Sequence, residues 1–151
     1  MFEKLLSPGV GDLGQHAGHK PVSRLQVTVV FTSVDATIAA LKRAGSLAGY
    51  LTTSITLIVA QVVPYPLPLN SPPVLLEFNE RRFRAIAGAT SAETTVRLYL
   101  CRDRWETLKS VLRPNSLIVV GGRRKWWDTE EKRLVGRLRR AGHDVIFTET
   151  D

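Results

Sequence analysis

The stretch LIVVGGRRKWWDTEEKRL, residues 117–134, joins an apolar run to two glycines, a basic run, two tryptophans and a charged segment. The β-branched residues before Gly121 are typical of a strand buried on both faces of a parallel sheet. Asp128, followed three residues later by Glu131, is close to a capping box and predicts the start of a helix. The stretch therefore predicts a strand, a glycine turn and a helix, which is the repeating unit of α/β folds.

The same alternation runs through the chain from residue 25 onward. Apolar or alternating runs predict strands over 25–32, 54–63, 94–101, 116–120 and 144–149. Apolar residues at helical spacing predict helices from the Asp35 cap to about Ala48, over 74–89, over 103–112 and from Asp128 to Ala141, before Gly142. Strands alternating with helices predict an α/β fold with an open, mainly parallel five-stranded sheet and helices on both faces.

The first 24 residues differ from this pattern. They have no sustained periodicity and carry four glycines, so residues 1–24 are predicted to be a flexible N-terminal tail and 25–151 a single domain. His16, His19 and Asp12 in this tail suggest a metal site, but solvated side chains are the favoured interpretation because ordering a glycine-rich segment costs entropy. No metal is expected.

The charge, the cysteine content and the length of the apolar segments limit the possible functions. The formal net charge of +7 and the pI of about 10.1 favour an anionic partner such as a nucleotide or a nucleic acid. One cysteine, Cys101, excludes an internal disulfide and fits a reducing cytoplasm, and it is interpreted as a packed side chain. The apolar segment 55–63 is too short to span a membrane and prolines follow it, so no membrane association is predicted.

Three segments resemble the universal stress protein family. They are VTVVFTSVDATIAAL (27–41), SLIVVGGRR (116–124) and HDVIFTE (143–149), and the likeness in element order and spacing covers residues 25–149. The resemblance implies a flavodoxin-like, Rossmann-like sheet, a role in the stress response and a cytoplasmic homodimer. It also implies, for one branch of the family, ATP bound between the first and fourth parallel strands.

The residues of that ATP site are largely replaced in this chain. The family's aspartate at the end of the first strand falls on Thr32, and Gly121 matches the first glycine of the G-x-x-G-x9-G-[S/T] signature. The remaining signature positions fall on Arg124, Leu134 and Val135. Glycines in such loops let backbone N–H groups approach phosphate oxygens. The resemblance therefore implies a divergent member without the standard ATP site, for which no cofactor is expected.

An alternative remains at the same place. A basic loop beside Thr32 would bind ATP or another anion through the charge of its side chains. This loop consists of Gly121, Gly122, Arg123, Arg124 and Lys125. Against this, three carboxylates occupy the first turn of the following helix and repel a phosphate there. A structural turn followed by a solvated basic loop is the favoured interpretation of residues 121–125.

Two surfaces suggest partners. One face of the last helix carries Arg133, Arg137 and Arg140 and lies close in sequence to Trp126 and Trp127. This basic and aromatic surface is a weaker candidate for nucleic-acid binding. The favoured interpretation is a solvated basic face. The apolar loop 62–76 and the final strand, which is expected at a sheet edge, favour homodimerisation. No pairing of a nucleophile with a base is evident. We therefore expect a non-catalytic regulatory or interaction module.

Overall fold

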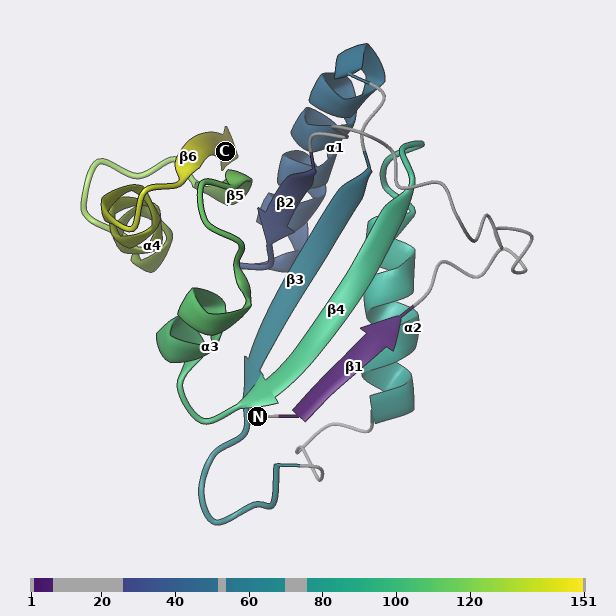
Figure 1. The fold of residues 1–151 in the computed structure, drawn as a ribbon, viewed down its shortest axis with the longest axis vertical. Helices are drawn as coiled ribbons and strands as arrows, with labels where there is room; N and C mark the ends of the chain where they lie inside the picture. Colours follow the sequence, from purple (N-terminus) through teal and green to yellow (C-terminus); the bar gives the residue numbers. More distant parts are fainter. Residues whose placement is uncertain (1, 7–25, 52–53, 70–75, 151) are drawn as a thin grey trace.

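The computed structural model describes residues 2–6, 26–51, 54–69 and 76–150. Its centre is a six-stranded sheet in the order β1-β4-β3-β2-β5-β6 (Figure 1). The five strands expected from the sequence are all present and mutually parallel: β2 (Val27–Val30), β3 (Ile55–Val62), β4 (Thr94–Cys101), β5 (Leu117–Arg123) and β6 (Asp144–Thr150). The predicted α/β fold with a five-stranded parallel sheet is thus confirmed.

The sixth strand corrects the expected N-terminal tail. Residues Phe2–Leu6 form β1, which pairs antiparallel with β4, so these five residues belong to the sheet rather than to a tail. Glu3 lies opposite Tyr99 in this pairing, and the Tyr99 hydroxyl donates a hydrogen bond to its carboxylate at 3.1 Å. The rest of the predicted tail, residue 1 and residues 7–24 with the two histidines, lies outside the described residues.

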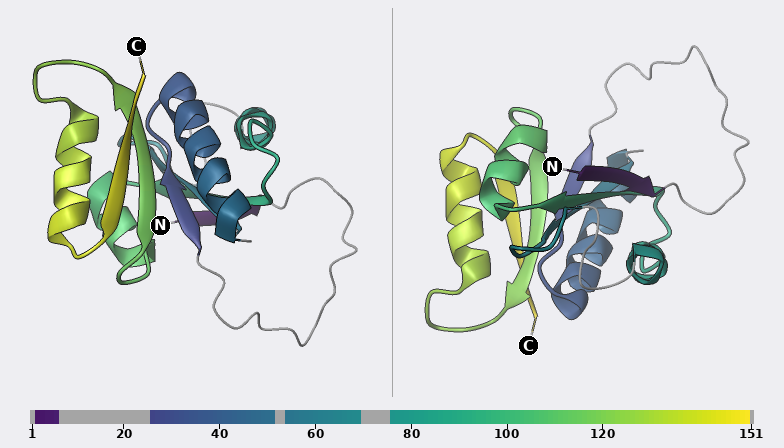
Figure 2. Two further views of the ribbon diagram at one scale, coloured as in Figure 1. Left: turned by 90° about the horizontal axis from the view of Figure 1, so that it is seen from above. Right: turned by 90° about the horizontal axis from the view of Figure 1, so that it is seen from below.

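Helices cover both faces of the sheet (Figure 2). On one face α1 (Val34–Leu51) and α2 (Leu76–Ala87) enclose a core that includes Leu41 and Phe83. On the other face α3 (Arg104–Val111) and α4 (Glu130–Arg140) enclose a second core built on Leu108 and Leu138. The central strands are apolar on both sides because each of their faces packs against helices.

Two helix starts differ from their predicted caps. The hydroxyl of Ser33 accepts a hydrogen bond from the Ala36 amide at 3.4 Å, so Ser33 caps α1 and Asp35 lies in its first turn. Similarly, Thr129 rather than Asp128 caps α4, accepting from the Lys132 amide at 3.3 Å. In both cases a β-hydroxyl one or two residues from the predicted aspartate occupies the cap position, where serine, threonine and aspartate are all favourable.

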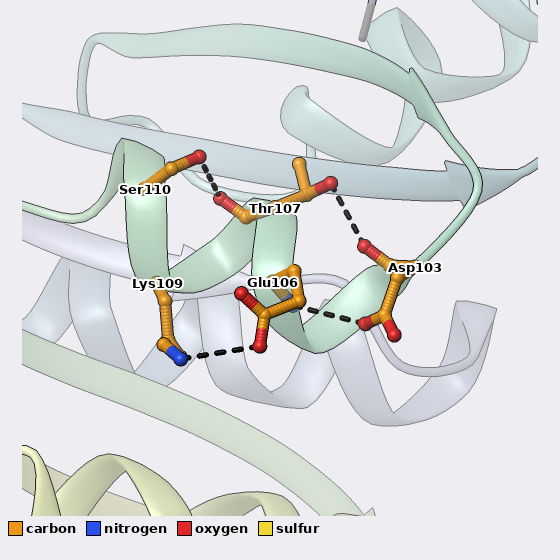
Figure 3. A network of polar contacts seen from close by, with 5 residues as sticks. All are labelled: Asp103, Glu106, Thr107, Lys109 and Ser110. Atoms are coloured by element: carbon orange, nitrogen blue, oxygen red, sulfur yellow. Dashed lines mark hydrogen bonds and ion pairs between the residues drawn. The ribbon is translucent and has the colours of Figure 1, made fainter.

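The other helix ends follow the sequence closely. Asp103 caps α3 by accepting from the Glu106 amide at 3.0 Å (Figure 3). The helix then ends at Val111, before Pro114, as expected. Gly142 has a φ of +95° just after α4, which is the left-handed conformation that favours glycine. For α2 the sequence predicts Phe78, Phe83 and Ile86 as apolar positions of one buried stripe, and this is wrong at Phe78, which is 54% exposed, while Phe83 and Ile86 are buried.

Candidate functional site

The carboxyl ends of β2 and β5 meet at the point where the sheet order reverses. The chain leaves β2 toward β3 on one side, whereas β5 lies on its other side and leads to β6. Ligands of open α/β sheets bind outside such a switch point. Thr32 follows β2, and its Oγ1 donates a hydrogen bond to the Gly121 carbonyl of β5 at 2.8 Å. The structure therefore brings together Thr32 and Gly121, two of the residues singled out from the sequence.

Both glycines of the predicted turn lie within strand β5, which corrects that prediction. Gly121 and Gly122 pair with Thr148 and Glu149 of β6, and the strand continues to Arg123. A Cβ on Gly121 would lie 2.0 Å from the Ala36 carbonyl oxygen in the first turn of α1. A Cβ on Gly122 would lie 2.7 Å from the Phe147 ring. The missing side chains therefore allow close packing, and both glycines are buried.

The basic residues that follow are held by contacts within the protein. Arg123 and Arg124 are exposed, and the Arg124 Nε lies 3.6 Å from a carboxylate oxygen of Glu149. The Lys125 Nζ lies 4.6 Å from the centre of the Trp127 ring. Trp126 is 92% exposed and contacts Trp127 edge to face. The expected solvated basic loop is thus present, although it begins three residues later than predicted, after Arg123.

A cleft of about 500 Å³ lies beside this loop at the amino ends of α1 and α4. Its positive charges come from Arg123, Lys125 and Arg133. Its negative charges come from four carboxylates, those of Asp35, Asp128, Glu130 and Glu131. The cleft therefore has one more negative than positive charge, and the carboxylates stand at the helix ends where a phosphate would otherwise be favoured.

The basic face of α4 is also partly engaged. Arg133 pairs with Asp128 at 3.4 Å, Arg140 donates to the Gly136 carbonyl at 3.2 Å, and the Arg137 guanidinium lies 5.7 Å from the centre of the Trp105 ring. Nucleic-acid binding by this face stays a prediction. Because such binding releases counterions, its affinity for a polynucleotide would fall linearly with salt on a logarithmic scale.

A second hollow, between α3 and α4, was not anticipated from the sequence. It has a volume of about 340 Å³ and is lined by four arginines, those at positions 102, 104, 133 and 137. Arg102 lies just before α3 and Arg104 is its first residue, whereas the other two arginines belong to α4, and only the fold brings these segments together. We call this hollow the α3/α4 groove. The sequence signal for it was the pair of arginines that follows Cys101, Arg102 and Arg104.

Other candidate chemistry is limited in the described part of the chain. Cys101 is 2% exposed, and its Sγ lies 3.6 Å from the Gln61 carbonyl oxygen, which confirms a packed side chain. Among the described residues there is no group of three or more metal-ligating side chains. No helix in the described segments has the length and apolar character needed to cross a membrane.

Comparison with known proteins supports the fold. No protein-family model and no curated protein matches the sequence. Among solved structures, a universal stress protein in complex with cAMP superposes with a TM-score of 0.51 at 22% identity. The match covers 85% of this chain and 100% of that protein. The chain therefore has the α/β fold of a universal stress protein, as the resemblance of its strand and helix order implied.

Proposed function

We propose that this chain is a non-catalytic regulatory or interaction module of universal-stress-protein type, acting in the cytoplasm without the standard ATP site. The packing of Gly121 and Gly122 carries this proposal. A glycine loop binds phosphate because its N–H groups are open to the ligand. Here the space beside the two glycines is taken by Ala36 and Phe147, so the residues serve helix and strand packing.

The charges around the switch point support the same conclusion. A nucleoside triphosphate brings several negative charges, and the adjacent cleft already has an excess of carboxylates. Thr32 replaces the family's aspartate, and its hydroxyl is used to bridge β2 and β5. Side-chain charge from Arg123 and Lys125 is the remaining means of holding a nucleotide there, and this defines the alternative function, a nucleotide or anion binder using residues 121–125.

Calorimetric titration with Mg-ATP and with cAMP separates the two functions. The cAMP bound by the solved neighbour makes it the natural second ligand. Wild-type protein is compared with an Arg123→Ala/Arg124→Ala variant, and an Arg81→Ala/Arg84→Ala variant on the exposed side of α2 controls for the loss of two charges. We expect no saturable heat from either nucleotide. Micromolar binding that is lost only in the Arg123/Arg124 variant would establish the alternative instead.

A further inference from the structure

The α3/α4 groove combines a charged rim with an apolar floor. Leu108, which is fully buried, and the partly buried Trp105 and Leu134 form the apolar part of its lining. Its volume, about 340 Å³, is that of a small-molecule site. The groove lies on the face of the sheet opposite α1, beside the core that packs under α3 and α4.

The rim has an excess of positive charge. Four guanidinium groups and the two carboxylates of Asp103 and Glu130 line the groove, so its lining has two more positive than negative charges. The Asp103 carboxylate also caps α3 by accepting a hydrogen bond from the Glu106 amide (Figure 3). Among the four arginines only Arg133 forms an ion pair with a described residue, and its partner is Asp128.

Two of the arginines are fixed in place by neutral acceptors. Arg102 donates to the carbonyls of Val63 and Leu67 at 2.8 and 2.7 Å. Arg104 donates to the Phe31 carbonyl, at the end of β2, at 2.7 Å. Carbonyl bonds orient a guanidinium without cancelling its charge. The two side chains are therefore ordered before a ligand binds, so binding does not carry the entropy cost of ordering them.

The other two arginines come from successive turns of α4. The Arg137 side chain makes no hydrogen bond or ion pair within the described residues, and its guanidinium stands over the Trp105 ring. The indole keeps this group near the apolar floor while its N–H donors stay available. Arg133 and Arg137 are four residues apart, so they lie one above the other on the same side of the helix.

These observations separate the groove from the cleft at the switch point. Both hollows are lined by Arg133, but the cleft has a net negative charge and the groove a net positive one. We propose that the α3/α4 groove binds a phosphate monoester, with the phosphate among the arginines and the ester group against Trp105 and Leu108. Guanidinium groups suit this ligand because their planar donors bind phosphate oxygens in pairs. This proposal is independent of whether ATP binds at residues 121–125.

The site can be observed through a single tryptophan. In a Trp126→Phe/Trp127→Phe background, Trp105 is the one tryptophan left in the chain. We expect inorganic phosphate and phenyl phosphate to change its fluorescence saturably, with phenyl phosphate binding more tightly because its ring covers the apolar floor. A short peptide with one phosphoserine is the third probe. The relative affinities of the two esters distinguish a small-molecule ligand from a phosphorylated protein segment.

Matched substitutions locate the binding. In that background, Arg137→Gln and Arg133→Gln should each weaken phenyl phosphate about tenfold or more, as expected for a lost charge-assisted hydrogen bond. Arg140→Gln, which removes the same charge from the same helix outside the groove, and Arg123→Gln, in the basic loop, should change affinity less than about twofold. Circular dichroism establishes that each variant is folded.

Three results would overturn the proposal. One is the absence of saturable binding of every probe up to about 10 mM, a concentration at which even a weak specific site is filled. Another is an equal loss in Arg140→Gln and Arg137→Gln, which would indicate a diffuse charge effect. The third is a loss confined to Arg123→Gln, which would place the anion at the basic loop.

Discussion

The carbonyl oxygen of Ala36 occupies the position that a side chain on Gly121 would take. A Cβ built on this glycine lies 2.0 Å from that oxygen and 2.6 Å from the carbonyl carbon. Both atoms belong to the backbone of the first turn of α1, so neither can move aside by a change of rotamer. Gly121 is therefore the contact that lets α1 approach β5 at the switch point.

Replacing this glycine should destabilise the fold. We expect Gly121→Ala to lower the free energy of unfolding by about 3 kcal/mol, because inserting a methyl group into a packed contact forces backbone shifts. Gly136→Ala in α4 is the matched control. Its Cβ would meet only the end of the Arg140 side chain at 3.7 Å. It should raise stability by about 0.8 kcal/mol through helix propensity. Urea denaturation measures both, and equal effects would contradict the packing role.

The bridge from Thr32 to Gly121 gives a second prediction at the same point. Thr32→Val should cost about 1 kcal/mol by removing a hydrogen bond of 2.8 Å. Thr32→Asp, which introduces the aspartate of the ATP-binding branch of universal stress proteins, should cost about 2 kcal/mol because it sets a carboxylate against a carbonyl acceptor. Thr32→Ser keeps the hydroxyl and should stay near wild type in the same denaturation series. A stable Thr32→Asp protein would show that this bridge is dispensable.

The sequence predicted those parts of the fold that leave a pattern within a single segment of the chain. The five parallel strands were found because β-branched runs such as 27–30 and 117–120 are buried on both faces and show this in their composition. Strand β1 was missed because five residues carry little periodicity, and its pairing depends on β4, far along the chain. Phe78 was misplaced because its position relative to α1 is a tertiary property.

The candidate site was less predictable for the same reason. Gly121 and Gly122 were interpreted as a turn because a Gly-Gly pair after a strand has that local meaning. Their actual role depends on Ala36 and Phe147, which only the folded chain brings into contact with them. The α3/α4 groove was missed because its four arginines come from two separate segments, the end of the β4–α3 connection with the first residue of α3, and α4. No spacing within one segment reveals such a site.

Tyr99 makes the protein sensitive to alkaline pH. Burial raises the pKa of its phenol, and the Glu3 carboxylate acts in the same direction, while Arg97 opposes them. A raised pKa in the folded state means that the folded protein holds the proton after the unfolded chain has lost it. The stabilisation is therefore complete below about pH 10, the value for an unfolded chain, and falls as pH rises through the higher folded pKa.

Substitution isolates this contribution. Tyr99→Phe should flatten the loss of stability above about pH 10, since the phenylalanine has no proton to lose. Glu3→Gln should reduce the loss without abolishing it, because burial is the larger cause. Urea midpoints measured across the alkaline range provide the test. If the urea midpoints of wild type and Tyr99→Phe fall equally with rising pH, groups other than Tyr99 cause the loss of stability at alkaline pH.

The prediction of homodimerisation rests on β6, which lies at one edge of the sheet. The Asp144 amide bonds to Ser116 of the neighbouring chain segment at 3.1 Å, and the Thr150 carbonyl accepts from the Arg124 amide at 2.7 Å. Because backbone groups alternate in direction along a strand, the amides of Val145, Phe147 and Glu149 face the open edge. This edge can pair with a second copy, and we expect a dimer in light scattering at micromolar concentration.

Proline substitutions test that edge. Glu149→Pro removes an outward amide and leaves the pairing with β5 intact, so it should yield a folded monomer. Thr148→Pro removes an inward amide at the next position and should instead lower the melting temperature, because it breaks the ladder with β5. A wild-type mass equal to one chain would refute dimerisation. A Glu149→Pro protein that remains a dimer would move the interface elsewhere, with the exposed loop around Tyr65 and Leu67 as the next surface to substitute.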